Sequence, residues 1–159
     1  TSWHDVEGNT CLFGGFKADN FQGHGLRYRG NLNVFPSTYG PTCAWLYPAS
    51  LTTYPGPFWP ARPELEESYT NNTCVVGPNF NYVFFPPTCD FADPRSIRFR
   101  LGNNTIVAPD ESTVVQGCGG KQMGVRDWLR LGRDEGTAVV KAAPTSAELV
   151  RMAWAVLFP

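Results

Sequence analysis

The sequence has few charged residues and few side chains that bind metals. Charged residues make up 17% of its 159 residues and the formal net charge is −1, which excludes a strong electrostatic attraction to nucleic acid or to anionic membranes. There are two histidines and no Cys-x-x-Cys pair, so the usual spacing of zinc ligands is missing, and we expect no metal ion and no cofactor. No apolar run is long enough to span a bilayer.

Glycine, proline and aromatic residues are abundant instead. The 16 glycines, 14 prolines and 14% of aromatic residues favour short strands joined by long turns, and predict a mainly β fold. Five cysteines without metal-binding spacing indicate disulfides, which form in oxidising compartments, so we expect a secreted, extracellular protein. Because five is odd, one thiol is free, joins a second chain, or has its partner beyond this sequence. The cysteines are Cys11, Cys43, Cys74, Cys89 and Cys118.

A repeat runs through the first two thirds of the chain. Four segments each place an asparagine before a short run of β-forming residues, at spacings of 22, 41 and 32 residues. One such coil cannot bury its apolar face alone, but stacked coils bury it together at a strand spacing of about 4.8 Å, with the asparagines in a ladder at one turn. The repeat therefore predicts a parallel β-helix. The four asparagines are Asn9, Asn31, Asn72 and Asn104.

Two stretches rich in proline and aromatic residues explain the wider spacings. Residues 36–66 and 77–94 are predicted to be loops inserted between the coils, because proline cannot donate a hydrogen bond to a strand ladder. The coils and their inserted loops then occupy residues 1–116.

The stacking also limits how the cysteines can pair. Cys11 and Cys74 fall in one column with a coil between them, which places them about 9–10 Å apart, whereas a disulfide needs Cα atoms within about 7 Å. We therefore expect that they do not pair with each other, and that their partners come from Cys43, Cys89 and Cys118. The preferred bridge is Cys74–Cys89, which closes a short loop.

The pattern changes at residue 117, and residues 117–159 are predicted to form a C-terminal cap with short helices. Residues 125–131 form a predicted helix ended by Gly132, and residues 137–140 a brief extended piece. Thr145 and Glu148 form a capping box that starts a final helix. One apolar face of that helix is expected to lie across the exposed end of the coils. This face consists of Leu149, Met152, Ala153, Val156 and Leu157.

An Asn-Asn-Thr-Ile-Val-Ala-Pro run (Asn103–Pro109) is followed by a Trp-x-x-Leu-Gly-x-Asp-x-Gly run (Trp128–Gly136) and a closing helix. This order resembles the end of right-handed parallel β-helix proteins, which include extracellular polysaccharide lyases and glycoside hydrolases. The resemblance covers residues 100–157 and implies a short right-handed parallel β-helix with long loops and a C-terminal helical cap. Because those enzymes carry many more coils than this chain, no catalytic residue is transferred from them.

One polar cluster has the residue types that a polysaccharide lyase needs. A lyase requires a base near the carbon next to a carboxylate, and cations that neutralise this carboxylate. The cluster consists of Lys17, Asp19, His24, Arg27 and Arg29. Because these residues flank glycine-rich turns, the alternative is a solvated polar face without catalytic function.

The first predicted loop carries several aromatic side chains, whose flat faces can stack on sugar rings or on another protein. The alternative is that they pack the loop back onto the coils. The candidates for carbohydrate or partner contact are Tyr39, Trp45, Tyr47, Tyr54 and Trp59.

Two Asn-x-Thr sequons predict N-glycans on Asn71 and Asn103, with chance occurrence as the alternative. Together these patterns predict an extracellular glycosylated β-helix module with a structural role, or with a carbohydrate-binding or protein-binding role, in an extracellular assembly. The expected partners are glycans, both covalently attached and bound as polysaccharide, and either a second copy of the chain or another chain joined through the unpaired cysteine. The alternatives are the C-terminal portion of a polysaccharide lyase or glycoside hydrolase, and a secreted toxin-like or lectin-like domain with an unrelated β fold.

Overall fold

The computed structural model describes residues 2–14, 16–19, 24–36, 42–47, 67–85, 99–117 and 121–158, which form three five-stranded sheets and two helices. Sheet A has the order β1 (Ser2–Glu7), β4 (His24–Arg29), β7 (Glu67–Thr70), β10 (Phe99–Gly102) and β14 (Asp134–Glu135). Sheet B has the order β15 (Ala138–Lys141), β11 (Thr105–Ala108), β8 (Thr73–Val75), β5 (Leu32–Val34) and β2 (Thr10–Leu12). Sheet C has the order β13 (Lys121–Gly124), β12 (Val114–Gly117), β9 (Asn81–Phe84), β6 (Thr42–Tyr47) and β3 (Phe16–Asp19).

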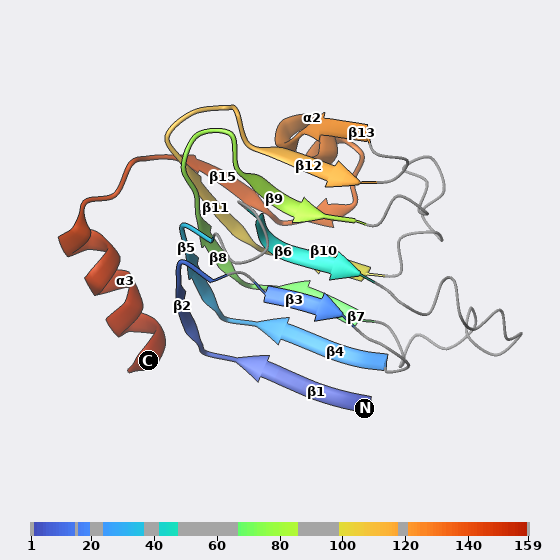
Figure 1. Cartoon of the computed structure of the whole chain (residues 1–159), viewed down its shortest axis with the longest axis horizontal. Helices are drawn as coiled ribbons and strands as arrows, with labels where there is room; N and C mark the ends of the chain where they lie inside the picture. Colours follow the sequence, from blue (N-terminus) through green and yellow to red (C-terminus); the bar gives the residue numbers. More distant parts are fainter. Residues whose placement is uncertain are drawn as a thin grey trace, which may run out of the picture.

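The chain visits the three sheets in the same order again and again. We call each set of three successive strands a unit: β1–β3 form unit 1, β4–β6 unit 2, β7–β9 unit 3 and β10–β12 unit 4. Each strand pairs in parallel with its equivalents in the neighbouring units, so the units lie side by side (Figure 1). The prediction of a mainly β fold with parallel strands and a C-terminal helix is confirmed.

The corner between sheets A and B explains the glycine or asparagine that precedes each strand of sheet B. The residue two positions before each of the five strands has a positive φ, between 54° and 74°. Only glycine, and asparagine to a lesser extent, tolerates this left-handed conformation without large strain. The five corner residues are Gly8, Gly30, Asn71, Asn103 and Gly136.

Both stretches predicted to be loops contain a strand, which corrects that prediction. β6 lies within residues 36–66 and β9 lies within residues 77–94. Each strand is a short run free of proline between prolines, so the composition of the whole stretch concealed it. These two strands form the middle of sheet C, and β6 pairs in parallel with β9.

The interior between the three sheets is a single apolar core. Its largest fully buried side chains come from all three sheets and from α2 (Val125–Arg130). The Trp128 ring of α2 packs against Phe85, with ring centroids 5.5 Å apart. Other large side chains of this core are Tyr69, Tyr82, Ile106, Val83 and Val115.

The helix α3 (Ser146–Leu157) covers the outer face of sheet B, not the end of the stack as predicted (Figure 1). Its apolar face packs against the outward-pointing side chains of sheet B, which are apolar and need cover. The predicted capping box of Thr145 and Glu148 is confirmed. The contacting residues of α3 are Leu149, Met152, Ala153 and Val156, and those of sheet B are Leu32, Val34, Val75 and Val107.

The last part of the chain closes one end of the stack. β13 turns back and pairs antiparallel with β12, and α2 follows it directly. The predicted helix at residues 125–131 is confirmed, with Gly132 in the left-handed conformation (φ 68°) just beyond it. The predicted extended piece corresponds to β15. Neither described helix is long and apolar enough to cross a membrane.

Candidate functional site

The predicted asparagine ladder runs along the corner between sheets A and B. The backbone N–H and the Nδ2 of Asn31 both donate to Oδ1 of Asn72, at 3.0 and 2.9 Å. Asn72 makes the same two bonds to Asn104, at 2.9 and 3.3 Å, and Asn9 makes them to Asn31, at 3.0 and 3.1 Å. The prediction that these four residues form one file is confirmed, and each unit donates to the unit that follows it.

The ladder also ties sheet A to the corner. Nδ2 of Asn31 donates to the carbonyl oxygen of Val6 at 2.8 Å, and Nδ2 of Asn72 donates to that of Tyr28 at 3.0 Å. These two side chains, like that of Asn104, are only about 1% exposed. Buried amides with so many partners stabilise the stack and leave no atom for a ligand, so the ladder is structural.

The corner geometry accounts for both predicted glycosylation motifs. The first asparagine of each sequon, Asn71 or Asn103, holds the left-handed corner position and is exposed. The second, Asn72 or Asn104, is the buried ladder residue, and the threonine that follows begins a strand of sheet B. The fold therefore favours Asn-Asn-Thr at this corner without any glycan. N-glycosylation of Asn71 and Asn103 stays a prediction. Both residues are exposed, so their side chains are accessible for it.

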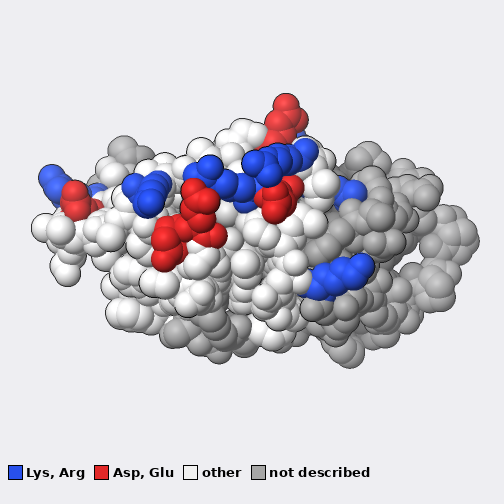
Figure 2. Space-filling view, turned by 90° about the horizontal axis from the view of Figure 1, so that it is seen from above, with Lys and Arg blue, Asp and Glu red and all other residues white. Residues whose placement is uncertain are grey.

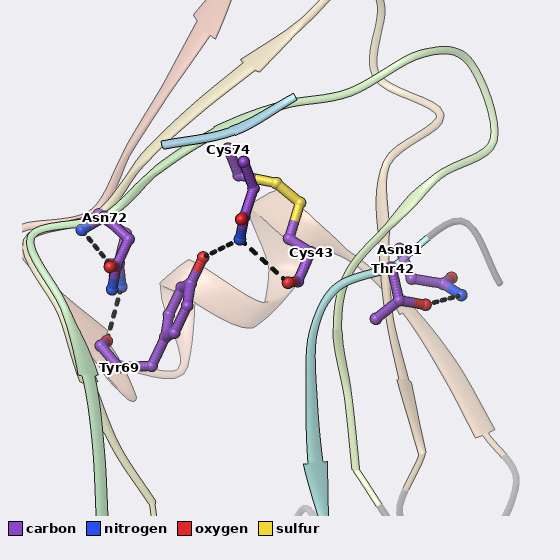
Figure 3. The surroundings of a disulfide bond; sticks show 8 residues. Thr42, Cys43, Tyr69, Asn72, Cys74 and Asn81 are labelled. Atoms are coloured by element: carbon purple, nitrogen blue, oxygen red, sulfur yellow. Dashed lines mark hydrogen bonds between the residues drawn. A yellow bond between two sulfur atoms is a disulfide. The ribbon is translucent and has the colours of Figure 1, made fainter. Parts of the chain in front are cut away.

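A disulfide joins Cys43 of β6 to Cys74 of β8, with a Cα–Cα distance of 6.1 Å (Figure 3). The predicted bridge Cys74–Cys89 is therefore wrong. Cys74 bonds to the cysteine that faces it across the interior, from sheet C, and not to the one that would close the shortest loop. The prediction that Cys11 and Cys74 do not pair is confirmed: Asn33 lies between them in the column, and Cys11 has no disulfide partner among the described residues. Cys89 and Cys118 lie outside the described residues.

A buried polar network adjoins this disulfide. Nδ2 of Asn33 donates to the carbonyl oxygen of Cys43 at 3.2 Å and to the Tyr69 hydroxyl at 3.3 Å (Figure 3). These bonds explain why a polar residue occupies the interior column otherwise held by cysteine and isoleucine. Burial raises the pKa of the Tyr69 hydroxyl well above its ordinary value, so it stays protonated.

Asp134 is a carboxyl that is buried at the closed end of the stack. It accepts hydrogen bonds from Nε1 of Trp128 at 3.4 Å and from the hydroxyl of Thr137. Burial raises the pKa of Asp134 above its usual value, although the hydrogen bonds from Thr137 and its other neighbours oppose this shift. Burial and the nearby Asp134 charge also raise the pKa of Tyr82. The site is enclosed by protein, so no substrate can reach it.

Sheet C carries the polar and aromatic group that is best placed to meet a ligand. The rings of Trp45 and Phe84 have centroids 4.5 Å apart, and both side chains are partly exposed and lie outside the core. Nδ2 of Asn81 donates to Oε1 of Gln116 at 3.0 Å and to the Thr42 hydroxyl at 3.3 Å. We call Trp45, Phe84, Asn81 and Gln116 the sheet C patch.

The strand register brings part of the predicted catalytic cluster to this patch. Lys17 pairs with Trp45 and Asp19 pairs with Tyr47, so these two predicted groups meet on sheet C. By contrast, His24, Arg27 and Arg29 lie on β4 in sheet A.

The remaining predicted residues contribute less to this site. Arg29 forms an ion pair with Glu7 at 2.9 Å, and the Arg27 side chain is exposed. Tyr39, Tyr54 and Trp59 lie outside the described residues. Sequence reasoning missed Phe84, Asn81 and Gln116. The only signal for the first two is the proline-free run within residues 77–94, a stretch whose prolines predict a loop.

Charges of both signs alternate on the surface over the closed end (Figure 2). Arg126 pairs with Glu111 at 2.8 Å and Arg130 pairs with Asp127 at 2.7 Å, and all four side chains are well exposed. This face therefore carries no extended field of one sign.

Within the described ranges, no group of three or more His, Cys, Asp or Glu side chains lies close enough together to hold a metal ion. No protein-family model, no curated protein and no solved structure matches the chain.

Proposed function

We propose that this chain is an extracellular right-handed parallel β-helix module that binds polysaccharide through the sheet C patch. The observation that carries this proposal is the Trp45–Phe84 ring pair beside the Asn81 and Gln116 amides on one sheet. Aromatic faces stack on the apolar faces of sugar rings, and amides hydrogen-bond sugar hydroxyls. The repeated passage of the chain through three parallel sheets supports the β-helix, because successive passes in one direction around a common core make a solenoid.

The disulfide supports an extracellular location. Cys43–Cys74 lies inside the core, and such bridges persist in oxidising compartments. The exposed Asn71 and Asn103 side chains are accessible for N-glycosylation. Glycan attachment is tested by the mass change on deglycosylation of secreted protein. Asn71→Gly and Asn103→Gly remove the sequons while keeping a residue that suits the left-handed corner, since Gly8 and Gly30 occupy the same position.

The binding test compares wild type with Trp45→Ala by calorimetric titration against neutral and acidic polysaccharides. Removing one stacked ring is expected to weaken binding by roughly tenfold. Trp154→Ala is the matched control, because Trp154 is an exposed tryptophan on α3, away from sheet C, and should leave affinity unchanged. The proposal fails if no polysaccharide binds, or if both variants lose affinity equally.

A second function has one specific observation in its favour. Lys17 pairs with Trp45 and Asp19 pairs with Tyr47 in the strand register, which supports a role of these two residues in acid–base chemistry beside the sugar-binding candidates. The chain would then be the C-terminal portion of a polysaccharide lyase or glycoside hydrolase. Product release from the same polysaccharides, lost in Lys17→Ala or in Asp19→Ala, would favour the enzyme over the binding module.

A further inference from the structure

Unit 1 has a neighbour on one side only. β1, β2 and β3 are the end strands of sheets A, B and C, and within the described residues nothing pairs with their outer edges (Figure 1). Each outer edge presents backbone N–H and C=O groups that can accept a further strand. The three edges lie at the same end of the stack, so they can be covered together by one further unit.

The side chains at this end continue columns that are buried elsewhere. Leu12 aligns with Val34 and Val75, which are 4% and 0% exposed, but Leu12 itself is 61% exposed. Phe13, next in the chain, is 64% exposed. The end of α3 contacts β2, and its last residues are also exposed and apolar. An additional strand beside β2 would give Leu12 a second neighbour in the row of Val34 and Val75, the row that α3 covers on β5 and β8.

The asparagine ladder shows which way such a strand must run. Asn9, Asn31 and Asn72 each donate the backbone N–H and Nδ2 to Oδ1 of the asparagine in the next unit. Asn9 makes both donations, yet within the described residues its own Oδ1 accepts no hydrogen bond. The missing donors are those of an asparagine one unit earlier, on a strand parallel to β2. A second copy that meets this edge about a two-fold axis would pair antiparallel, and would place a different corner at Asn9.

Cys11 adds a second, covalent feature to the same edge. It occupies the position in sheet B that Cys74 occupies two units later. The partner of Cys74 is Cys43, which lies on the sheet C strand of the preceding unit. The equivalent partner of Cys11 therefore lies on the sheet C strand of a unit before unit 1.

We propose that the outer edge of unit 1 binds one further three-strand unit of the same repeat, parallel to unit 1, whose sheet C strand carries a cysteine that bonds to Cys11. The Cα–Cα distance would be about 6 Å, as ordinary disulfides require. The two thiols lose two protons and two electrons to oxidised glutathione, which becomes two molecules of reduced glutathione. This inference concerns assembly of the stack and does not depend on the binding of polysaccharide by sheet C.

Unit 2 of the chain provides a suitable probe. Residues 24–47 contain a ladder asparagine, Asn31, and the disulfide cysteine, Cys43. A copy of residues 24–47 is fused to the N-terminal side of Ser2 of the full chain, through a copy of residues 20–23, the connection between β3 and β4. A second version has a longer Gly/Ser linker, so that an unsuitable connection does not decide the result.

The extended chain is refolded with reduced and oxidised glutathione. Peptide mapping is expected to find Cys11 bonded to the added copy of Cys43, with Cys11 no longer alkylated by iodoacetamide and the melting temperature raised by several degrees. Replacing the added cysteine by serine should restore alkylation but keep part of the thermal gain. Replacing the added asparagine by alanine should reduce that gain.

Two results would overturn the inference. One is an extended chain, with either linker, whose Cys11 stays reactive and whose melting temperature is unchanged. The other is a dimer of the unextended chain linked Cys11 to Cys11, which would identify a second copy as the occupant of this edge.

Discussion

The middle of the asparagine ladder and its two ends differ in a way that shows how this stack is terminated. Asn31, Asn72 and Asn104 are buried and bonded on both sides. At the C-terminal end, Thr137 takes the ladder position: its hydroxyl accepts from the backbone N–H of Asn104 at 2.9 Å, and its own N–H bonds to the Asp134 carbonyl oxygen. At the N-terminal end, Asn9 is exposed and its Oδ1 accepts no bond from the described residues. The C-terminal end of the ladder is therefore closed by a threonine in place of asparagine, whereas the N-terminal end still carries the repeated asparagine.

The closed end shows what a finished edge requires. The Thr137 hydroxyl accepts a hydrogen bond from the backbone N–H of Asn104 in the preceding unit, and it donates a hydrogen bond to the Asp134 carboxyl at its own corner. β13 pairs antiparallel with β12, so sheet C does not continue in the same direction there. Nothing of this kind covers the outer edges of β1, β2 and β3 among the described residues.

The largest expected effect comes from the middle of the ladder. Asn72→Ala removes the acceptor of the buried Asn31 N–H and side-chain amide and one donor to the Tyr28 carbonyl oxygen, and should lower the free energy of unfolding by about 3–4 kcal/mol. Asn9→Ala removes bonds that are partly exposed, and should cost about 1 kcal/mol or less. Urea denaturation of both variants measures the difference. Equal costs would contradict the distinction between the middle and the end of the ladder.

Cys74 in the middle of the stack and Cys11 at its open end should also differ in their contribution to stability, by slightly less than the two asparagines. Cys74→Ser breaks the bridge that spans a sequence separation of 31 residues, and should destabilise the protein by about 2–4 kcal/mol. Cys11→Ser at the open end should change stability by about 0.5 kcal/mol or less. Thermal unfolding with and without reductant measures both effects, since reductant should destabilise wild type and Cys11→Ser but not Cys74→Ser.

The closed end should show the smallest effect, which depends on pH. Burial raises the pKa of Asp134 above its unfolded value of 3.8, so the folded state binds the proton more tightly than the unfolded chain. The resulting stability is fully present below pH 3.8 and is lost as the pH rises through the folded-state pKa. Asp134→Asn, which mimics the protonated carboxyl, should therefore become progressively more stable than wild type as the pH rises.

Urea denaturation across this pH range gives the difference curve between the two proteins. Asp127→Asn is the control, because Asp127 is exposed and pairs with Arg130 on the surface. The control should keep the pH response that wild type owes to Asp134. A difference curve for Asp134→Asn that is flat, or that falls with rising pH, would contradict the role of burial at this carboxyl.

The predictions that came from local rules agree with the structure. The ladder followed from the recurrence of asparagine before β-forming runs, because one side chain bonds the equivalent residue in the next unit. The capping box of Thr145 and Glu148 and the helix before Gly132 depend on a few neighbouring residues. Each is specified within a short segment, so a sequence pattern was enough to predict it.

The failed predictions concern relations between distant parts of the chain. The proline-rich neighbours of β6 and β9 predict loops at these positions, so the sequence pattern gives no indication of sheet C. Without sheet C, the approach of Cys43 to Cys74 could not be foreseen. The ladder position of Thr137 was missed because threonine replaces asparagine there, although Gly136 before it has the corner pattern.

The corner between sheets A and B can be recognised from the amino-acid sequence, since a left-handed glycine or asparagine followed by a bonding side chain is a local requirement repeated along the chain. The partner of Cys74, the face that α3 covers, and the shared surface of Trp45 and Phe84 depend on the packing of the whole chain. Each of these contacts joins residues from different units or sheets. Their proximity depends on how the units stack around the common core, and no short segment encodes that.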